Sequence, residues 1–168
     1  MAAPSRMQTL FTPWRYVYIT ARAPSGCFFC AAAGEPGADE LVVHRAAHHL
    51  VMLNLHPYTN GHLMVAPYAH LAAPRDAAPE ARQEFWPLVL QAQRVLERAY
   101  GPDGFNLGMN LGSGAGAGVP GHFHFHVVPR WQGDTNFMSV VAEVRLVPED
   151  LAAAASRLRT LFAQEGAA

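Results

Sequence analysis

The apolar residues along the chain follow two different periods, which predict two long helices and several short strands. Apolar residues recur at helical spacing between Pro79 and Tyr100, and Gly101-Pro102 ends that pattern. A second helical pattern begins near 148–150 and carries Leu151, Ala155, Leu158 and Phe162. We therefore expect one long helix in the middle of the chain and another near its end.

Shorter apolar stretches predict β-strands over Leu41–Val43, Leu50–Asn54, His62–Ala66, Phe105–Asn110 and Phe123–Val128. The turn 56–61 joins the second of these strands to the third. We expect a loose start over residues 1–9, an aromatic, strand-prone segment over 10–19, and a Gly/Pro loop over 31–39. Strands connected as meanders, with two helices to cover one face, predict a single α+β domain over residues 1–168 on an antiparallel sheet.

The segment 121–130 contains three histidines at two-residue spacing, His122, His124 and His126, with apolar residues between them. A strand sends alternate side chains to opposite faces, with ~6.6–6.8 Å between neighbours on one face. The three imidazoles would then line one wall of a cleft while the phenylalanines enter the core. Imidazole can attack, donate a proton or bind a metal near pH 7. This spacing indicates a functional site; the alternatives are a structural metal site or an accident of composition in a chain with nine histidines.

Composition restricts the class of protein. The chain has 168 residues, 51% hydrophobic and 15% charged, which is typical of one globular domain. Its formal net charge of −1 gives no general attraction to nucleic acid or to an anionic membrane. The chain contains no lysine, which excludes Schiff-base and Walker-type lysine chemistry. We see no apolar run of membrane-spanning length and no signal-peptide core, so we expect a cytoplasmic protein.

Cys27 and Cys30 are the only cysteines, and their spacing has two interpretations. A redox pair usually begins a helix that follows a strand, and the Pro24-Ser25-Gly26 segment gives little support for that context. A zinc site needs two further ligands, which His70 and one histidine of the triad could supply. The spacing alone leaves both interpretations open. Four other histidines lie in or beside predicted loops and are expected to be solvated: His44, His48, His49 and His56.

The segment 112–118, between the last two predicted strands, consists of glycine, alanine and one serine. Such a loop lets backbone N–H groups approach an anion closely, so it could hold phosphate; a simple tight turn is the alternative. One match to G-x-G-x-x-G (Gly116, Gly118 and Gly121) contains Pro120 and leads into a strand where a helix is required, which argues against a dinucleotide fingerprint. Because the loop adjoins the triad, we favour the phosphate interpretation.

Together these features indicate phosphorus chemistry. A neutral imidazole can attack phosphorus to form a phosphoramidate, and nearby N–H groups and a second histidine can stabilise the charge that develops. The sequence shows no obvious carboxylate cluster, which argues against a two-metal phosphatase.

The chain resembles the histidine triad family, whose signature is His-φ-His-φ-His-φ-φ with φ apolar. Residues 122–128 read His-Phe-His-Phe-His-Val-Val, and 54–67 resemble the family segment from a ribose-contacting Asp or Asn to a Gly-His strand. Asn110 and Ala115-Gly116 match the family's Asn and Ala-Gly before the triad. The resemblance covers nearly the whole chain. It implies a five-stranded antiparallel sheet with helices, a homodimer with a larger continuous sheet, and nucleotides as ligands.

The resemblance also implies roles for individual residues. His124 would be the nucleophile, His126 would contact the leaving oxygen, and His62 would support them from the neighbouring strand. A structural zinc would be bound by Cys27, Cys30, His70 and His122. Contacts to the nucleotide are implied for Asn54 and Asn110, and the phosphate interpretation of the loop adds Gly112, Ser113, Gly116, Ala117 and Gly118. Phe29, Leu53 and Leu55 match positions that form the family's apolar base pocket, and aromatic packing in a core is an equal alternative for them.

Two departures from the family pattern narrow the branch. Many members have Ala-Gly-Gln-Ser before the triad, whereas this chain has a longer Ala-Gly-Ala-Gly-Val-Pro-Gly, which leaves backbone groups as phosphate donors. His126 stands where the hexose-1-phosphate uridylyltransferases have Gln. Segments 10–15 and 130–137 resemble the bacterial diadenosine tetraphosphate phosphorylases. We therefore expect an enzyme that cleaves dinucleoside polyphosphates by phosphorolysis or hydrolysis; a phosphoramidase and a non-catalytic nucleotide-binding protein are the alternatives.

Overall fold

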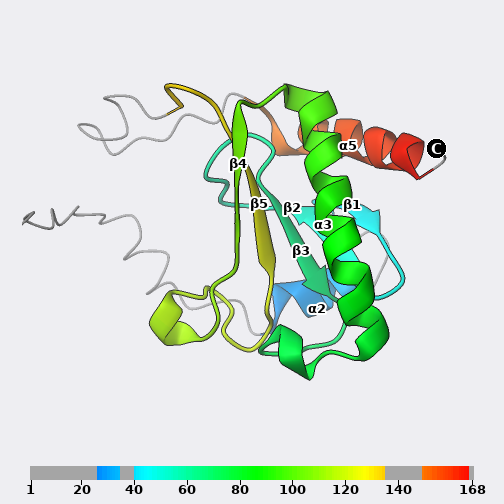
Figure 1. The fold of residues 1–168 in the computed structure, drawn as a ribbon, viewed down its shortest axis with the longest axis vertical. Coiled ribbons are helices and arrows are strands. Elements are labelled where there is room, and N and C mark those ends of the chain that lie inside the picture. Colours follow the sequence, from blue (N-terminus) through cyan, green and yellow to red (C-terminus); the bar gives the residue numbers. More distant parts are fainter. Residues whose placement is uncertain (1–25, 35–39, 135–148, 167–168) are drawn as a thin grey trace, which may run out of the picture.

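The computed structural model describes residues 26–34, 40–134 and 149–166 (Figure 1). The predicted loose start and lead-in over 1–19 lie outside these residues. Five strands form one sheet: β1 (Val42–Arg45), β2 (His49–Leu53), β3 (Leu63–Pro67), β4 (Gly104–Gly108) and β5 (Phe125–Arg130). Their order across the sheet is β1-β2-β3-β5-β4, and all neighbouring pairs are antiparallel. The predicted five-stranded antiparallel sheet is confirmed.

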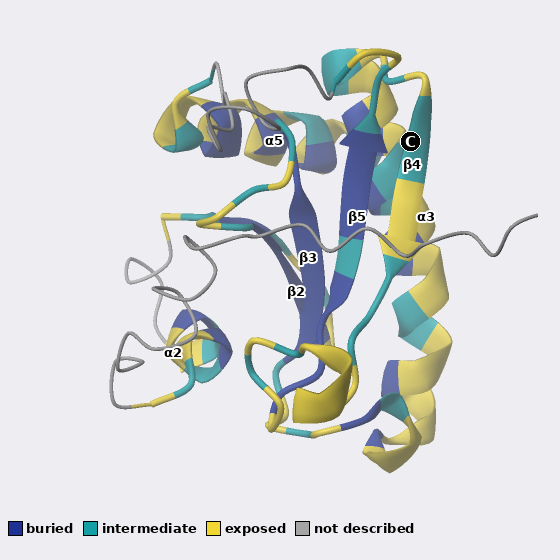
Figure 2. Ribbon diagram, turned by 90° about the vertical axis from the view of Figure 1, so that its left-hand side faces the viewer, coloured by how far each residue is buried: buried dark blue, intermediate teal, exposed yellow. Residues whose placement is uncertain are grey.

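Two helices cover one face of this sheet, as the apolar periods predict. They are α3 (Pro79–Tyr100) and α5 (Leu151–Glu165). Proline suits the first turn of α3, and Gly101 ends the helix with a positive φ of 53°. The Asp150 carboxylate caps α5 by accepting hydrogen bonds from two backbone N–H groups. The buried side chains of both helices pack on the dark strands of Figure 2. No helix in the described ranges is long and apolar enough to cross a membrane.

A short helix, α2 (Phe28–Gly34), lies against the opposite face of the sheet (Figure 1). The expectation of a loop from Ala31 onward is wrong for residues 31–34. The helix is held by packing rather than by its own sequence: Phe29 is fully buried in a second apolar cluster with side chains of β2 and β3. The Arg45 guanidinium also donates to the Ala32 carbonyl, at 2.6 Å, near the end of the helix. A helix this short is marginal without such contacts.

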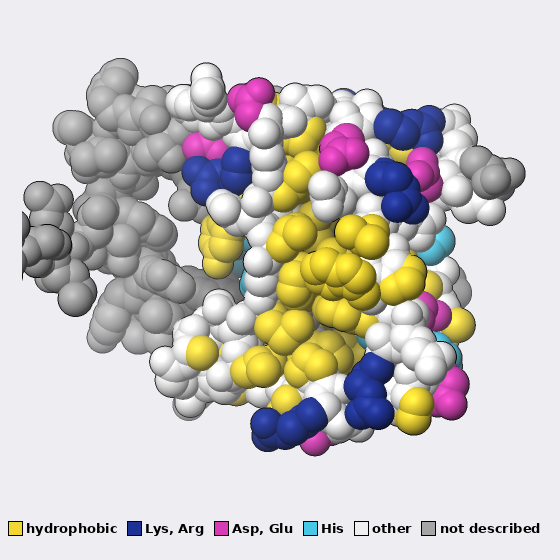
Figure 3. All heavy atoms as spheres, in the orientation of Figure 1, with side chains coloured by type: hydrophobic (Ala, Val, Ile, Leu, Met, Phe, Trp, Pro, Cys, Tyr) yellow, Lys and Arg dark blue, Asp and Glu magenta, His cyan; other side chains and the backbone are white. Residues whose placement is uncertain are grey.

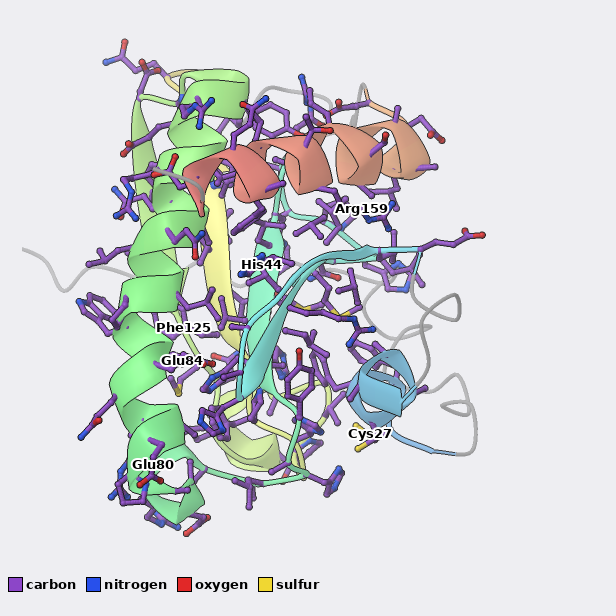
Figure 4. The ribbon with its side chains drawn as sticks, turned by 90° about the vertical axis from the view of Figure 1, so that its right-hand side faces the viewer. Cys27, His44, Glu80, Glu84, Phe125 and Arg159 are labelled. Atoms are coloured by element: carbon purple, nitrogen blue, oxygen red, sulfur yellow. The ribbon has the colours of Figure 1, made fainter. Side chains whose placement is uncertain are left out.

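His49 is not solvated, contrary to expectation. Its side chain is 1% exposed, and its Nδ1 lies 2.9 Å from the Glu84 carboxylate on α3. The same carboxylate accepts the backbone N–H groups of Ala47 and His48, so one side chain ties the β1–β2 turn to α3 (Figure 4). His44 is half-buried and stacks on Phe162 of α5, and burial lowers its pKa. His48 and His56 are exposed, as expected.

Strand boundaries differ from the predicted ones by one or two residues, and the shift at β5 affects the triad. This strand begins at Phe125 rather than at Phe123. His122 and His124 therefore precede the strand, and the chain there is held by the Phe123 N–H, which donates to the Leu71 carbonyl at 2.7 Å. A central position between β3 and β4 fixes the register, with His126 opposite Met64 and Gly108.

Candidate active site and metal centre

The three triad histidines lie on the face of the sheet that carries α2. Phe125 and Val127 belong to the core under α3, so His126, between them, points to the other face. The ring of Phe29 packs against the rings of both His122 and His124, with centroids 5.1 and 4.8 Å apart. The triad spacing therefore does collect the imidazoles on one side, although His122 is fully buried and His124 is only 6% exposed.

Aromatic and imidazole rings form a continuous row across this face. Centroid separations are 4.8 Å from Phe29 to His124 and 4.9 Å from His124 to His126. The next separations are 5.0 Å from His126 to His62 and 4.6 Å from His62 to Tyr58, which ends the row. Each histidine thus has a defined neighbour on both sides, and the row runs from α2 to the turn between β2 and β3.

Hydrogen bonds fix which nitrogen carries the proton in two of these histidines. The Tyr58 backbone N–H donates to Nδ1 of His62 at 3.1 Å, so a neutral His62 has its proton on Nε2. That Nε2–H donates to Nδ1 of His126 at 2.8 Å. The neutral His126 consequently carries its own proton on Nε2. It is a donor on the side away from His62.

His124 has the opposite tautomer. Its Nδ1–H donates to the backbone carbonyl of His122 at 3.1 Å, which leaves the lone pair on Nε2. A nucleophilic nitrogen therefore stands beside a hydrogen-bond donor on His126. This is the pairing that transfer of a phosphoryl-type group requires, one atom to attack and one to assist the leaving oxygen.

The site keeps its histidines neutral. Burial lowers the pKa of His124, although its bond to the His122 carbonyl opposes the shift. Burial, and secondarily the neighbouring His124, lowers the pKa of His126 to about 4. Because both groups are uncharged at pH 7, the lone pair of His124 is available for attack without prior loss of a proton.

Cys27, Cys30, His70 and His122 come together beside this row, as the family resemblance implies. One ligand atom from each residue lies within 4.8 Å of all the others. Sulfur–nitrogen distances of 3.2–3.5 Å join Cys30 to His70, Cys27 to His122 and Cys30 to His122. Ligands of a tetrahedral zinc stand about 3.3–3.8 Å apart for usual zinc–ligand bond lengths. The four side chains therefore fit zinc.

The surroundings of the cluster also suit a metal. His122 donates its Nε2–H to the Pro67 carbonyl at 2.8 Å, which directs Nδ1 toward the sulfurs, as in zinc sites generally. Burial and the adjacent Cys27 raise the pKa of Cys30, so a second thiolate needs a cation nearby. Cys27 directly precedes α2 (Figure 4). Its carbonyl accepts the Ala31 N–H. The helix start that the redox interpretation requires is thus present, although the Pro-Ser-Gly segment before Cys27 did not predict it.

The residues implied for nucleotide binding are less uniformly placed. The Asn54 side chain accepts the His56 N–H at 2.9 Å and lies 3.4 Å from Nδ1 of His62, at the Tyr58 end of the row. Leu53 is 1% exposed and belongs to the core under α3, on the face away from the triad, so core packing is the one of its two interpretations that the structure supports. Phe29 lies beside the triad but is fully buried, and it acts as a packing surface for the histidines.

The glycine-rich loop lies exposed on the chain just before the triad. Gly112 and Gly116 have φ values of 79° and 81°, conformations that favour glycine. The N–H groups of Ala115, Gly116 and Ala117 donate to carbonyls within the loop, so a phosphate would have to use other donors or rearrange this turn. Ser113 and Gly118 are exposed, and Asn110 follows the strand β4 that pairs with His126. Their contacts to a nucleotide remain predictions.

Comparison with known proteins agrees with this geometry. Residues 35–133 match the HIT domain family. The chain belongs to the histidine triad family. It is 35% identical over 172 residues, covering 95% of this chain and 87% of the relative, to an AP-4-A phosphorylase of Mycobacterium tuberculosis. It is also 30% identical over 105 residues to an adenosine 5'-monophosphoramidase of Schizosaccharomyces pombe, covering 62% of this chain and 74% of that one.

Among solved structures, a zinc-bound histidine triad family protein from Mycobacterium smegmatis superposes with a TM-score of 0.68 and 28% identity. That match covers 84% of this chain and 96% of the other. Membership of this family supports an enzyme that processes nucleotides, and the zinc-bound relative supports the metal assignment made above from the four clustered ligands.

Sequence reasoning missed two parts of the site. Tyr58 was recognised only as part of a turn, and its contacts to two histidines depend on how that turn folds over β5. The role of Phe29 as a common support for His122 and His124 depends on the unexpected helix α2. The two phenylalanines between the cysteines, Phe28 and Phe29, were the available signal.

Proposed function

We propose that this protein is a diadenosine tetraphosphate phosphorylase, which converts the dinucleotide and inorganic phosphate to ATP and ADP. The observation that carries the proposal is the pair of opposite tautomers: a lone pair on His124 Nε2 beside a proton on His126 Nε2. The 35% identical phosphorylase supports the choice of substrate and acceptor.

In the first step, Nε2 of His124 attacks the phosphorus next to one adenosine. A phosphorus–nitrogen bond forms, the bond to the bridging oxygen breaks, and the departing oxygen of ATP accepts a hydrogen bond from the Nε2–H of His126. In the second step an oxygen of inorganic phosphate attacks the adenylyl-histidine. The phosphorus–nitrogen bond breaks, ADP leaves, and His124 regains its lone pair. His62 holds His126 in the required tautomer throughout.

We further propose that Cys27, Cys30, His70 and His122 hold a structural zinc. When bound, the metal would cross-link α2 to the chain before β5, and no chemical step requires it. Thiolate ligands survive in a reducing compartment, which is consistent with a cytoplasmic location.

The third proposal is a homodimer formed through α3 and β4. In the sheet order, β4 is an edge strand, and its Leu107 is 39% exposed on the face that also carries α3. Trp86 and Leu90 on α3 are 50% and 38% exposed. Hydrophobic side chains gather over α3 and the adjoining sheet (Figure 3). A second copy suits this surface because two edge strands related by a twofold axis can pair in antiparallel fashion and bury both apolar faces.

Incubating the protein with diadenosine tetraphosphate, with and without phosphate, tests the main proposal. We expect ATP and ADP in equal amounts and strict dependence on phosphate. The His124→Ala variant should lose turnover by at least about a thousandfold while unfolding at a similar temperature. The matched control is His48→Ala, an exposed histidine on the β1–β2 turn, which should keep full activity. Turnover without phosphate would contradict phosphorolysis, and an active His124→Ala would contradict the assigned nucleophile.

The second candidate function is cleavage of adenosine phosphoramidates, which the similarity to the Schizosaccharomyces pombe enzyme favours. The same His124 attack would apply, with an amine as the leaving group. Faster turnover of adenosine 5'-phosphoramidate than of diadenosine tetraphosphate would favour this candidate. Tight nucleotide binding with no turnover of either substrate would instead indicate a binding protein.

A further inference from the structure

Tyr58 is an exposed aromatic residue placed against the catalytic histidines. Its ring packs on His62 with a centroid separation of 4.6 Å and on His126 with one of 6.0 Å. Nevertheless 45% of its surface stays exposed. An aromatic ring that is partly exposed beside a reactive centre can contact a ligand.

The turn that carries Tyr58 is held from several sides. The Thr59 hydroxyl donates to the Pro129 carbonyl at 2.8 Å, which ties the turn to β5. The His62 N–H donates to the Thr59 carbonyl, and Gly61, with a φ of 71°, lies so close to Tyr100 that a Cβ there would be 2.6 Å from its ring. The Tyr58 ring is therefore a preorganised surface, which lowers the entropic cost of a contact made with it.

The order of the rings indicates which part of the substrate reaches Tyr58. The row begins with the fully buried Phe29 and continues through His124 and His126 toward Tyr58. In an in-line displacement the leaving oxygen departs from the side of phosphorus opposite the attacking nitrogen. With His124 as the nucleophile and His126 at the departing oxygen, the leaving nucleotide lies near His126, whose ring centroid is 6.0 Å from that of Tyr58.

We propose that Tyr58 is a specificity-determining residue that stacks on the base of the leaving nucleotide. This inference rests on the proposed function and adds a subsite for the second nucleoside. An aromatic ring accepts the π-face of any base, so the subsite selects for a second nucleoside without selecting strongly among bases. Substrates that lack this nucleoside forgo the contact.

Isothermal titration calorimetry on the full-length protein can separate the two halves of the substrate. One ligand is AMP, which fills only the adenylyl half, and the other is a non-cleavable diadenosine tetraphosphate analogue with methylene bridges. For Tyr58→Leu we expect the Kd of the analogue to rise about tenfold and that of AMP to change less than twofold. Tyr58→Phe keeps the ring and should bind both ligands like the wild type. Tyr58→Gln, a second non-aromatic variant, should repeat the effect of leucine if the leucine variant folds poorly.

Several results would overturn the inference. Equal loss of affinity for both ligands would mean that Tyr58 only supports His62 and His126, and unchanged affinities would mean that it makes no contact. Loss of affinity for the analogue in Tyr58→Phe as well as in Tyr58→Leu would assign the contact to the hydroxyl instead of the ring. In each of these cases wild-type turnover of diadenosine tetraphosphate would leave the proposed function intact. A wild-type protein that neither binds the analogue nor cleaves the dinucleotide would overturn both.

Discussion

Replacing His126 by glutamine should make the folded protein more resistant to acid. The pKa of His126 is about 4 in the folded protein because of burial and the neighbouring His124, against about 6.5 in an unfolded chain. Protonation of His126 would also place a second N–H, on its Nδ1, facing the Nε2–H of His62, so the hydrogen bond between the two rings would be lost. His62 cannot avoid this by changing tautomer, because its Nδ1 accepts the Tyr58 N–H. Between pH 6.5 and 4 the unfolded chain therefore binds more protons, and stability falls as the pH falls.

The size of this effect follows from the two pKa values. One pKa unit corresponds to 1.36 kcal/mol, so His126 alone lowers the free energy of unfolding by about 2 kcal/mol between pH 7.5 and pH 5. The full loss of unfolding free energy due to His126, reached below pH 4, is about 3 kcal/mol. Glutamine does not titrate, and its side-chain oxygen can still accept the His62 proton. In His126→Gln this part of the acid dependence should disappear while the rest remains.

Urea unfolding of both proteins at pH 7.5, 6.5 and 5.0 measures this difference directly. The relevant quantity is the change in unfolding free energy with pH in the wild type minus the change in the variant, because contributions from other histidines and from zinc cancel to first order. A difference near 2 kcal/mol at pH 5 is expected. Parallel pH profiles would refute the reasoning, because they would mean that His126 takes up its proton in the folded state as easily as in the unfolded one.

Three further expectations concern the metal, the fold and the dimer. Cys30→Ser should lower zinc content, measured by plasma mass spectrometry, well below one ion per chain and lower the unfolding temperature; full zinc occupancy would contradict the ligand set. Glu84→Gln should cost about 1–3 kcal/mol in urea unfolding, because an amide cannot accept all the N–H groups that the carboxylate accepts, whereas Glu80→Gln, exposed at the start of α3, should cost little. Trp86→Glu should convert a dimer to monomers in sedimentation velocity, and a wild-type monomer would contradict the proposed interface.

Periodicity in the sequence predicted the parts of the fold whose stability comes from one continuous apolar stripe. The long helix α3 begins and ends where its proline and glycine predict, and the sheet has the expected strands. Helix α2 has no such stripe. It spans seven residues and is held by the burial of Phe29 between segments distant in sequence. Contacts of this kind depend on the tertiary fold, so propensity could not reveal them.

The same distinction explains which site residues were predicted. Spacing and family resemblance brought together the triad, His62 and the four metal ligands, because these residues are chemically distinctive. His49 was misjudged because its partner, Glu84, lies 35 positions away on a helix surface that looks solvated in sequence. For Leu53 the sequence left base pocket and core open, because alternation along β2 does not say which face carries the site, and only the register of the sheet decides it.

His122 connects the proposed metal centre to the nucleophile through a single residue. Its ring nitrogen faces the cysteine sulfurs, while its backbone carbonyl accepts the Nδ1–H that sets the tautomer of His124. Phe29, which lies between the two cysteines in sequence, packs on both imidazoles. A metal that fixes α2 against His122 would therefore also fix the direction of the His124 lone pair. Loss of zinc should then lower kcat more than it raises KM, because Asn54 and the glycine-rich loop, which we expect to bind the nucleotide, are not metal ligands, whereas attack depends on the orientation of one nitrogen.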